Sequence, residues 1–567
     1  PPGAHVEVDS ALNLRLTLAQ NPVATTAGAA ERRSMTPSAE ELENDPIGLE
    51  IMWSRLINIT EQCWHTVIRT AFSLIIGEAQ DFACEILDAK GQQLAHSPRA
   101  MPVFNITLAL AVNAMIRKFP IETLRPGDVL MTNDPWLCAG HLFDIAFATP
   151  VFRDGKVVAI MGCVGHVADI GGTKDSLNAR EIYEEGIQIP PIKLYKEGRI
   201  NEDLVALISE NVRGSEQVIG DIHALVSANA SGAKLILEFM DEYQMHDLEV
   251  LAGVIQNRAE KAMRDAVSRL PDGVYEVVDY MDDDGLTDQP VPIRVCITVA
   301  GDEITVDFTG TSPQRPGCIN APQAISVSAC LYVIRCIVGE EAPANQGCLR
   351  PIKIITPRGT LVNPEPQRGV AGGNVETSQR ITDVLFSALA QALPELIPAA
   401  SQGTMNNLLV GGHDLNRDKP FVYYETIGGG MGARPTKDGI SGIHTHMTNT
   451  MNTPVEAFEF AFPMRLKRYA IRRGSGGRGK YQGGDGLVRD VEFLAPARVT
   501  ILSERRKFPP PGFHGGHHGE TGENVLLRGG YEEVHLAGKE TLDVEPGDVL
   551  SIRTPGGGGW GAPEDDK

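Results

Sequence analysis

The sequence predicts a mixed fold of the α/β (α+β) class, with an N-terminal α/β part and a Gly-rich, β-rich C-terminal part. Apolar residues recur every three or four positions over 49–67, which is the period of an amphipathic helix. Polar and apolar residues alternate within 275–308, as they do in half-buried strands. Glycine dominates the chain after residue 405, which is typical of tight turns between strands.

Three regions are expected in order along the chain: an extended N-terminal arm over 1–45, an α/β domain over 46–270, and a mixed α/β to β-rich region over 271–567. The arm is rich in Ala, Thr, Pro and Glu and holds no sustained periodicity. Asp45 stands directly before the first periodic helix, where an aspartate is a favoured N-cap.

Individual elements follow from shorter patterns. Apolar runs separated by turn residues predict strands over 82–87, 129–133, 145–152 and 157–165. Residues 203–270 are helical in composition, and buried helices are expected over 322–340 and 376–394.

Composition excludes several classes of partner. The chain has 567 residues, with 51 Lys and Arg against 73 Asp and Glu, which gives a formal charge of −22. Nucleic acids and anionic membrane surfaces are therefore not expected as partners, because phosphates are bound by basic side chains. No apolar run approaches the ~20 residues that span a bilayer.

The cysteines and the N-terminus indicate a compartment. Nine cysteines are scattered along the chain without a C-x-x-C pair, which argues against a disulfide framework or a Cys-rich zinc site. The first residues lack the basic-then-apolar pattern of a secretory signal. We therefore expect a cytoplasmic protein in a reducing environment.

The sharpest chemical feature is the pair His141 and Asp144, followed by His166 at the end of an apolar run. Imidazole and carboxylate ligands suit zinc or manganese. Asp81, at the start of another strand, is the candidate fourth ligand, and Asp169 is an alternative. On spacing alone, separate loop residues that make hydrogen bonds explain the pattern better, because two histidines and two acids are too common to be specific.

Other motifs are less informative. The chain has neither a phosphate-binding G-x-x-x-x-G-K-[ST] loop nor a G-x-G-x-x-G that opens a helix. The GGGMG run at 428–432 fits a turn between strands better than an anion cradle. The histidines near 514–518 fit a surface loop. The polar run at 401–407 either satisfies buried backbone or lines a polar pocket.

Together these motifs resemble a known family, and the match runs from Asp45 to about Leu527. The matching segments are DPIGLEI (45–51), DFACEILDAKG (81–91), NDPWLCAGHLFDI (133–145), GHVADIGG (165–172), DFTGTSPQRPGCINAP (307–322), VAGGNVETSQR (370–380), ASQGTMNN (400–407), HTHMTNTMNTPVE (444–456) and SERRKFPPPG (503–512). They are similar to the hydantoinase B family, whose relatives include N-methylhydantoinase, 5-oxoprolinase, caprolactamase, and the acetone and acetophenone carboxylases.

The resemblance implies an ATP-dependent enzyme built from two kinds of subunit. By motif match, the metal ligands fall on Asp81, His141, Asp144 and His166, so the N-terminal α/β part bears a divalent metal, zinc or manganese. No catalytic side chain is assigned, because water bound to the metal is the expected reactant. ATP is expected on a hydantoinase A-like partner subunit of acetate-kinase-like fold, in an (αβ)2 or larger hetero-oligomer.

The expected function is hydrolysis of a cyclic amide, of the hydantoin, lactam or oxoproline type, after phosphorylation on the partner subunit. One alternative is a ketone carboxylase of the acetone or acetophenone type, which joins bicarbonate and a ketone enolate. A further alternative is a non-catalytic scaffold subunit. The chain departs from many family members at Phe143, where Pro is common, and at Phe104, where His is frequent.

Overall fold

The computed structural model describes residues 4–8, 14–18, 36–104, 106–173, 177–339 and 344–563. The chain divides into two compact units, Pro1–Met35 and Thr36–Lys567. In the first unit, strands β1 (Ala4–Val8) and β2 (Leu14–Leu18) pair in antiparallel fashion.

The arm expected over 1–45 stays a prediction, and most of it lies outside the described residues; within that range, α1 (Ala39–Asn44) belongs to the second unit. Ser38 and Glu41 cap this helix reciprocally, each side chain bonding the other residue's backbone N–H. The boundary expected at residue 270 stays a prediction.

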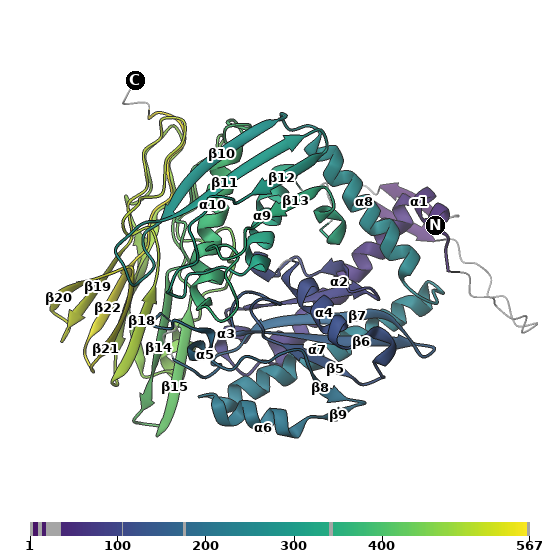
Figure 1. Ribbon diagram of the computed structural model, residues 1–567, viewed down its shortest axis with the longest axis horizontal. Helices are drawn as coiled ribbons and strands as arrows, with labels where there is room; N and C mark the ends of the chain where they lie inside the picture. The colour runs from purple at the N-terminus through teal and green to yellow at the C-terminus, as the bar shows by residue number, and fades with distance from the viewer. Residues whose placement is uncertain are drawn as a thin grey trace, which may run out of the picture. The chain divides into compact units, whose positions relative to one another are not determined.

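The N-terminal half of the second unit is built around a seven-stranded sheet of order β4-β3-β7-β6-β5-β8-β9 (Figure 1). Its strands are β3 (Phe82–Asp88), β4 (Gln93–His96), β5 (Val129–Thr132), β6 (Asp144–Arg153), β7 (Lys156–His166), β8 (Ile192–Lys196) and β9 (Arg199–Ile200). The four strands expected from apolar runs are β3, β5, β6 and β7. The turn between β6 and β7 has positive φ at Asp154 and Gly155, as expected for this hairpin sequence.

Helices cover both faces of this sheet. They are α2 (Pro46–Thr70), α3 (Leu74–Gly77), α4 (Thr107–Lys118), α5 (Ile182–Glu185), α6 (Glu202–Asn211), α7 (Ser215–Glu242) and α8 (Glu249–Val267). Side chains of α2 and α7 share one apolar core with Phe82, and side chains of α4 share another with Ala83. Asp45 accepts a hydrogen bond from the Gly48 N–H at the start of α2, so the expected N-cap is confirmed.

The second half holds three further sheets. Their orders are β10-β11-β12-β13, β15-β14-β18-β21 and β16-β17-β22-β19-β20. The strands are β10 (Gly273–Met281), β11 (Val291–Ala300), β12 (Glu303–Asp307), β13 (Ile352–Ile355), β14 (Asn407–Asp414), β15 (Lys419–Glu425), β16 (Met464–Arg472), β17 (Gly486–Phe493), β18 (Ala497–Leu502), β19 (Glu523–Arg528), β20 (Glu532–Leu536), β21 (Lys539–Val544) and β22 (Val549–Arg553). The alternation expected over 275–308 appears as alternating burial along β10 and β11.

The helices of this half are α9 (Gln323–Val338), α10 (Ser378–Leu389) and α11 (Val455–Ala461). The first two confirm the helices expected over 322–340 and 376–394. A π-helical turn, Gly373–Thr377, runs directly into α10. Such turns are rare and are frequent at functional sites.

The interpretation of the glycine runs as tight turns is wrong for 428–430 and 556–559. Within these described runs no glycine has a positive φ. The segments instead lie backbone against backbone, since Gly430 donates to the Pro555 carbonyl at 3.0 Å and Gly557 to the Gly484 carbonyl at 2.9 Å. A Cβ on Gly430 would sit 2.0 Å from the Gly484 oxygen. Glycine is required here for close approach, not for a turn.

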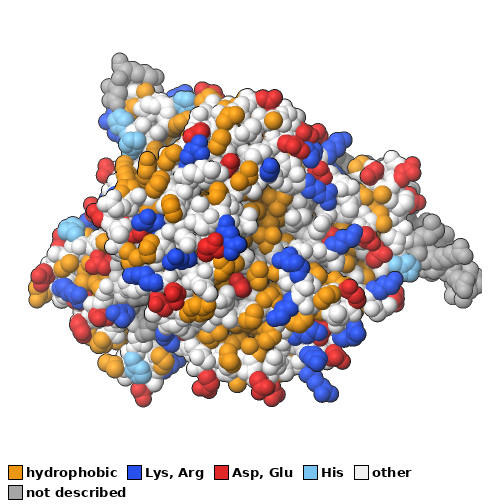
Figure 2. Space-filling model, in the orientation of Figure 1, with side chains coloured by type: hydrophobic (Ala, Val, Ile, Leu, Met, Phe, Trp, Pro, Cys, Tyr) orange, Lys and Arg blue, Asp and Glu red, His pale blue; other side chains and the backbone are white. Residues whose placement is uncertain are grey.

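Charged side chains of both signs are interspersed over the face drawn in Figure 2, with no gathering of Lys and Arg there. Among the helices that the structure describes, none combines the length and the apolarity needed to cross a membrane.

Candidate metal centre

Three neighbouring strands of the seven-stranded sheet bring the predicted ligands together. β6 begins at Asp144 and β7 ends at His166, and these two residues are directly paired in the ladder. Asp81 stands immediately before β3, where its carbonyl accepts the His166 N–H at 3.0 Å. His141 lies in the loop that enters β6. One edge of the sheet therefore carries all four residues predicted from the sequence.

Within this group, His141, Asp144 and His166 form the tightest set, with ligand atoms within 4.8 Å of one another. We call these three residues the metal triad. His141 Nε2 lies 2.8 Å from Asp144 Oδ2, and His166 Nδ1 lies 3.3 Å from Asp144 Oδ1. Asp81 stands slightly apart, with Oδ2 at 3.9 Å from His166 Nδ1. All four side chains are buried.

The donor set fits a divalent cation. Among the described residues, His141 Nε2 and Asp144 Oδ1 are buried without a hydrogen-bond partner, although other triad atoms lie close to each. Their short contacts do not have hydrogen-bond geometry, and buried polar atoms are rarely left unpaired. Lone pairs that point toward one place without a hydrogen-bond donor between them are suited to bind a cation. Imidazole nitrogen with carboxylate oxygen matches the ligands of zinc and manganese.

The electrostatics support the protonation states that bind a metal. Burial would raise the pKa of Asp144, but the imidazoles of His141 and His166 outweigh it and hold this pKa below its usual value. Burial lowers the pKa of His166, which favours the neutral imidazole. Burial, and then the charge of Asp144, raise the pKa of Asp81 well above its usual value. A cation would reverse this last shift by neutralising the paired carboxylates.

Two aromatic rings stack on the His166 imidazole. The Phe143 ring lies on one side, with centroids 5.2 Å apart and planes at 4°. Tyr424 of β15 lies at 4.8 Å and 10°. The orientation of a triad nitrogen is therefore fixed by parallel stacking.

The π-helical turn contacts the triad through a hydrogen bond. Asn374 Nδ2 donates to Asp144 Oδ2 at 3.2 Å and also to the Ala139 carbonyl. Glu376, from the same turn, accepts from Asn407 Nδ2 at 2.7 Å. Asn407 Oδ1 in turn accepts from the Tyr424 hydroxyl at 2.9 Å. Neighbours of this kind orient metal ligands in other proteins.

Sequence reasoning missed Asn374 and Tyr424 as members of the site. Both lie far along the chain from the triad. The GGNVET segment signals only a helix start, and a π-helical turn leaves no periodic pattern in a sequence. The polar run at 401–407 both satisfies buried backbone and lines a pocket. Asn407 Nδ2 donates to the Leu502 carbonyl at 2.8 Å, and Asn407 also borders the cavity beside the triad.

The other candidate metal ligands from the sequence take part in structural contacts. Asp169, the alternative ligand, pairs with Arg213 Nη1 at 2.7 Å. His514 Nε2 lies 2.9 Å from the Pro394 carbonyl on an exposed segment.

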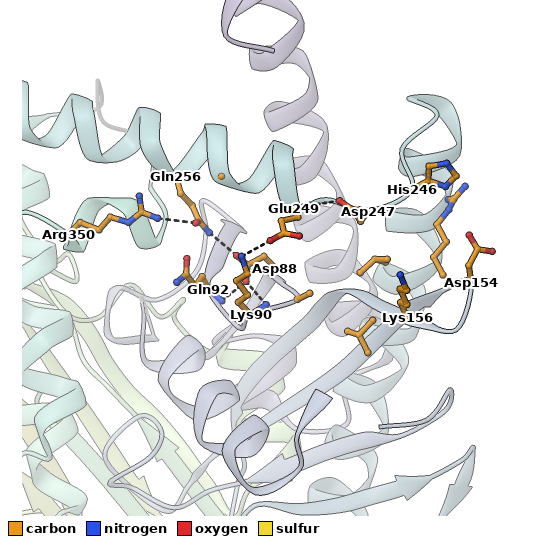
Figure 3. A pocket seen from close by; sticks show the side chains of 15 residues that line it. Asp88, Lys90, Gln92, Asp154, Lys156, His246, Asp247, Glu249, Gln256 and Arg350 are labelled. Carbon is orange, nitrogen blue, oxygen red and sulfur yellow. Dashed lines mark hydrogen bonds and ion pairs between the residues drawn. The ribbon is translucent and has the colours of Figure 1, made fainter. Parts of the chain in front are cut away.

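Two cavities lie at opposite ends of the strands that carry the triad. A small one of ≈ 40 Å³ borders His141 and His166. A larger one of ≈ 650 Å³ lies at the opposite ends of the same strands, near Asp88 and Lys156 (Figure 3). Its side chains are largely tied to one another, as in the Lys90–Glu249 pair at 2.7 Å. Because it lies at the opposite strand ends, the larger cavity is remote from the triad.

The chain is similar to several known proteins. The family model described as Hydantoinase B/oxoprolinase matches residues 45–563. The 5-oxoprolinase 1 of Arabidopsis thaliana is 38% identical over 93% of this chain and 43% of its own length. The chain thus spans about two-fifths of that relative.

A putative B-type component of a D-/L-hydantoinase from Pseudomonas sp. is 32% identical over 92% of this chain and 90% of its own length. The crystal structure of an ATP-dependent caprolactamase from Pseudomonas jessenii matches with a TM-score of 0.85 and 26% identity, over 92% of this chain and 93% of that chain.

Proposed function

Because the chain belongs to the hydantoinase B/oxoprolinase family, we propose that it is the metal-bearing part of an ATP-dependent enzyme that hydrolyses a cyclic amide. The observation that carries this proposal is the buried metal triad, with its unpaired His141 Nε2 and Asp144 Oδ1. The names of the similar proteins, an oxoprolinase, a hydantoinase component and a caprolactamase, favour a cyclic amide as the substrate.

His141, Asp144 and His166 would hold zinc or manganese, with Asp81 as the fourth ligand. A divalent cation at this place supplies Lewis acidity and lowers the pKa of water toward neutrality. The remaining chemistry is that of the substrate. An unstrained cyclic amide is a poor electrophile, and phosphorylation of its oxygen by ATP creates a better leaving group.

The chain's own residues have three tasks in this scheme. Asn374 holds the Asp144 carboxylate by its hydrogen bond. Phe143 and Tyr424 fix the plane of the His166 ring. Apolar side chains around the small cavity keep bulk solvent away from the reacting amide, which strengthens the electrostatic interactions inside.

ATP binding is assigned to a partner. The similar Pseudomonas protein is named as one component of a hydantoinase and has nearly the length of this chain. More than half of the Arabidopsis relative lies outside the match, which leaves room for a second activity in one polypeptide. We propose a hydantoinase A-like ATP-binding protein as the partner, with at least two copies of each chain in the complex.

Product analysis of the complex with its ATP-binding partner tests this function. The complex is incubated with ATP and hydantoins or lactams, and separately with ATP, bicarbonate and ketones. We expect ring-opened product and ADP to form together without bicarbonate. A bicarbonate-dependent 3-oxo acid would identify a ketone carboxylase instead, and no product in either arm would favour a scaffold.

A further inference from the structure

The small cavity beside the metal triad has mainly apolar walls. His141 and His166 border it on one side. Leu409 of β14, Val422 of β15 and Leu502 of β18 line it from the opposite sheet. Phe143 and Val375 complete the apolar lining. A ligand that reaches the triad therefore lies against hydrocarbon on most of its surface.

Among the described residues that line this small cavity, which we call the chamber, Asp169 is the one charged side chain, and Asp144 lies next to the lining histidines. Asp144 belongs to the triad. Asp169, on the rim, binds the Arg213 guanidinium at 2.7 Å and the Arg213 N–H at 2.5 Å. The same guanidinium also donates to the Gly172 carbonyl. The positive charge of Arg213 is thus compensated from within the chain.

These observations make the binding of a negatively charged substrate unfavourable. Moving a carboxylate from water into an apolar cavity is expensive unless a counter-charge is supplied. Asp81 and Asp144, as ligands of a divalent cation, offset its two positive charges. Carboxylates nearby also repel an incoming anion. An uncharged ring meets none of these penalties and gains from contact with apolar walls.

We propose, on the premise of the proposed function, that the site takes an uncharged cyclic amide with apolar ring faces and discriminates against a lactam that bears a carboxylate on its ring. In 5-oxoproline the carboxylate is attached to the carbon next to the amide nitrogen. Only the amide nitrogen and one ring carbon separate this carboxylate from the reacting carbonyl, so a carbonyl that faces the triad brings the carboxylate close to the apolar lining. The preferred substrate of this chain would then differ from 5-oxoproline, which the name of its oxoprolinase relatives indicates.

Polar side chains lie in a groove next to the chamber. The chamber measures ≈ 40 Å³. A groove of ≈ 340 Å³ adjoins it, because Ala168, Asp169 and Val422 border both. Ser215 and Lys419 line that groove. A substituent remote from the reacting carbonyl would lie among these polar groups.

Matched substrates test the proposal. 2-Pyrrolidinone and 5-oxoproline share one five-membered lactam ring and differ by the carboxylate. Hydantoin and hydantoin-5-acetic acid form a second pair. The complex with its ATP-binding partner is assayed for ring opening and ADP release. We expect kcat/KM to favour the uncharged member of a pair by about tenfold or more, since a buried unpaired charge is strongly rejected.

The possible results are distinguishable. Equal or better use of 5-oxoproline would overturn this inference and leave the proposed function standing. Failure to open any of the four rings would overturn the proposed function as well. A binding measurement gives a second readout. With Co²⁺ loaded into the chain, 2-pyrrolidinone should change the visible absorption at concentrations at which 5-oxoproline does not, and the reverse order would contradict us.

A positive charge placed on the chamber wall should change the preference between the charged and the uncharged lactam. Val422 is half-buried at the junction of chamber and groove. Val422→Lys supplies a cation, and Val422→Met supplies similar length without charge. We expect Val422→Lys to raise the 5-oxoproline to 2-pyrrolidinone ratio of kcat/KM about tenfold over Val422→Met. An unchanged ratio in a folded Val422→Lys complex would show that charge does not set this preference.

Discussion

The imidazole of His166 lies parallel to the phenol ring of Tyr424, with centroids 4.8 Å apart and planes at 10°. His166 ends β7 of the N-terminal sheet, whereas Tyr424 belongs to β15 in the C-terminal half. A side chain from a different sheet thus stacks on one residue of the metal triad. An N-terminal fragment alone would lack half of the stacking that orients His166.

Removing this ring should weaken metal binding. Stacking of an aromatic pair contributes about 0.5–1.5 kcal/mol beyond buried area, so Tyr424→Leu should raise the Kd for Zn²⁺ roughly three- to tenfold. Tyr424→Phe keeps the ring and loses only the hydrogen bond to Asn407. Chelator competition measures both variants. Equal affinities for Tyr424→Leu and the unmodified chain would show that the ring does not orient His166.

Asn374 should act on the metal without touching it. Its amide donates to Asp144, and loss of such a contact typically costs about 10–100-fold in metal affinity. We therefore expect Asn374→Ala to raise the Kd for Zn²⁺ within this range and to shift the visible spectrum of the Co²⁺ form. Asn58→Ala, on the exposed side of α2, is the matched control and should change neither. A normal spectrum in Asn374→Ala would disprove the positioning role.

Stability should depend on a buried ion pair between Lys539 and Glu504. Both side chains are almost fully buried, and Glu504 also faces Arg380 at 3.4 Å. Lys539→Met leaves a buried carboxylate short of one partner, which typically costs about 3–5 kcal/mol. Thermal unfolding should occur several degrees lower. Lys234→Met, on the exposed surface of α7, should leave Tm unchanged. A Tm for Lys539→Met equal to that of this control would contradict the prediction.

Acid should destabilise the protein through His444. Burial lowers the pKa of His444 to about 4, against an ordinary value near 6.5. The unfolded chain binds this proton first as the pH falls, so stability is lost between about pH 6.5 and 4. At the lower limit the loss reaches ~3 kcal/mol.

A pH series of Tm separates this contribution from those of buried carboxylates. Burial raises the pKa of Glu185 to about 8, and that shift acts in the opposite direction as the pH changes. Comparison of variants removes this common background. His444→Gln should lose less Tm between pH 7 and 5 than the unmodified chain, while His413→Gln, at an exposed position, should follow it. Parallel curves for all three would refute the assignment.

Local patterns in the sequence predict much of the fold. The cap at Asp45, the strands that carry the predicted ligands, and α9 and α10 all follow from short-range periodicity, and the structure confirms them. The resemblance to the hydantoinase B family is confirmed as well. Local chemistry is sufficient here because each of these elements buries one regular face.

Long-range packing accounts for what the sequence could not predict. Gly430 and Gly557 were expected in turns, yet they allow backbone segments to touch across more than a hundred residues. Tyr424 reaches His166 only because two sheets meet. Asn374 contacts Asp144 from a π-helical turn that lies 230 residues further along the chain. Periodicity carries no information on such contacts.

The central claim is that the metal triad binds a divalent cation that the reaction requires. The most direct test measures metal content and ring opening on the same sample of the complex, for the unmodified chain and for His141→Ala. We predict about one zinc or manganese ion per unmodified chain, and in His141→Ala an assembled complex that has lost both the metal and turnover. A variant that loses the metal yet keeps near-normal turnover would contradict the assignment of the chemistry to this chain.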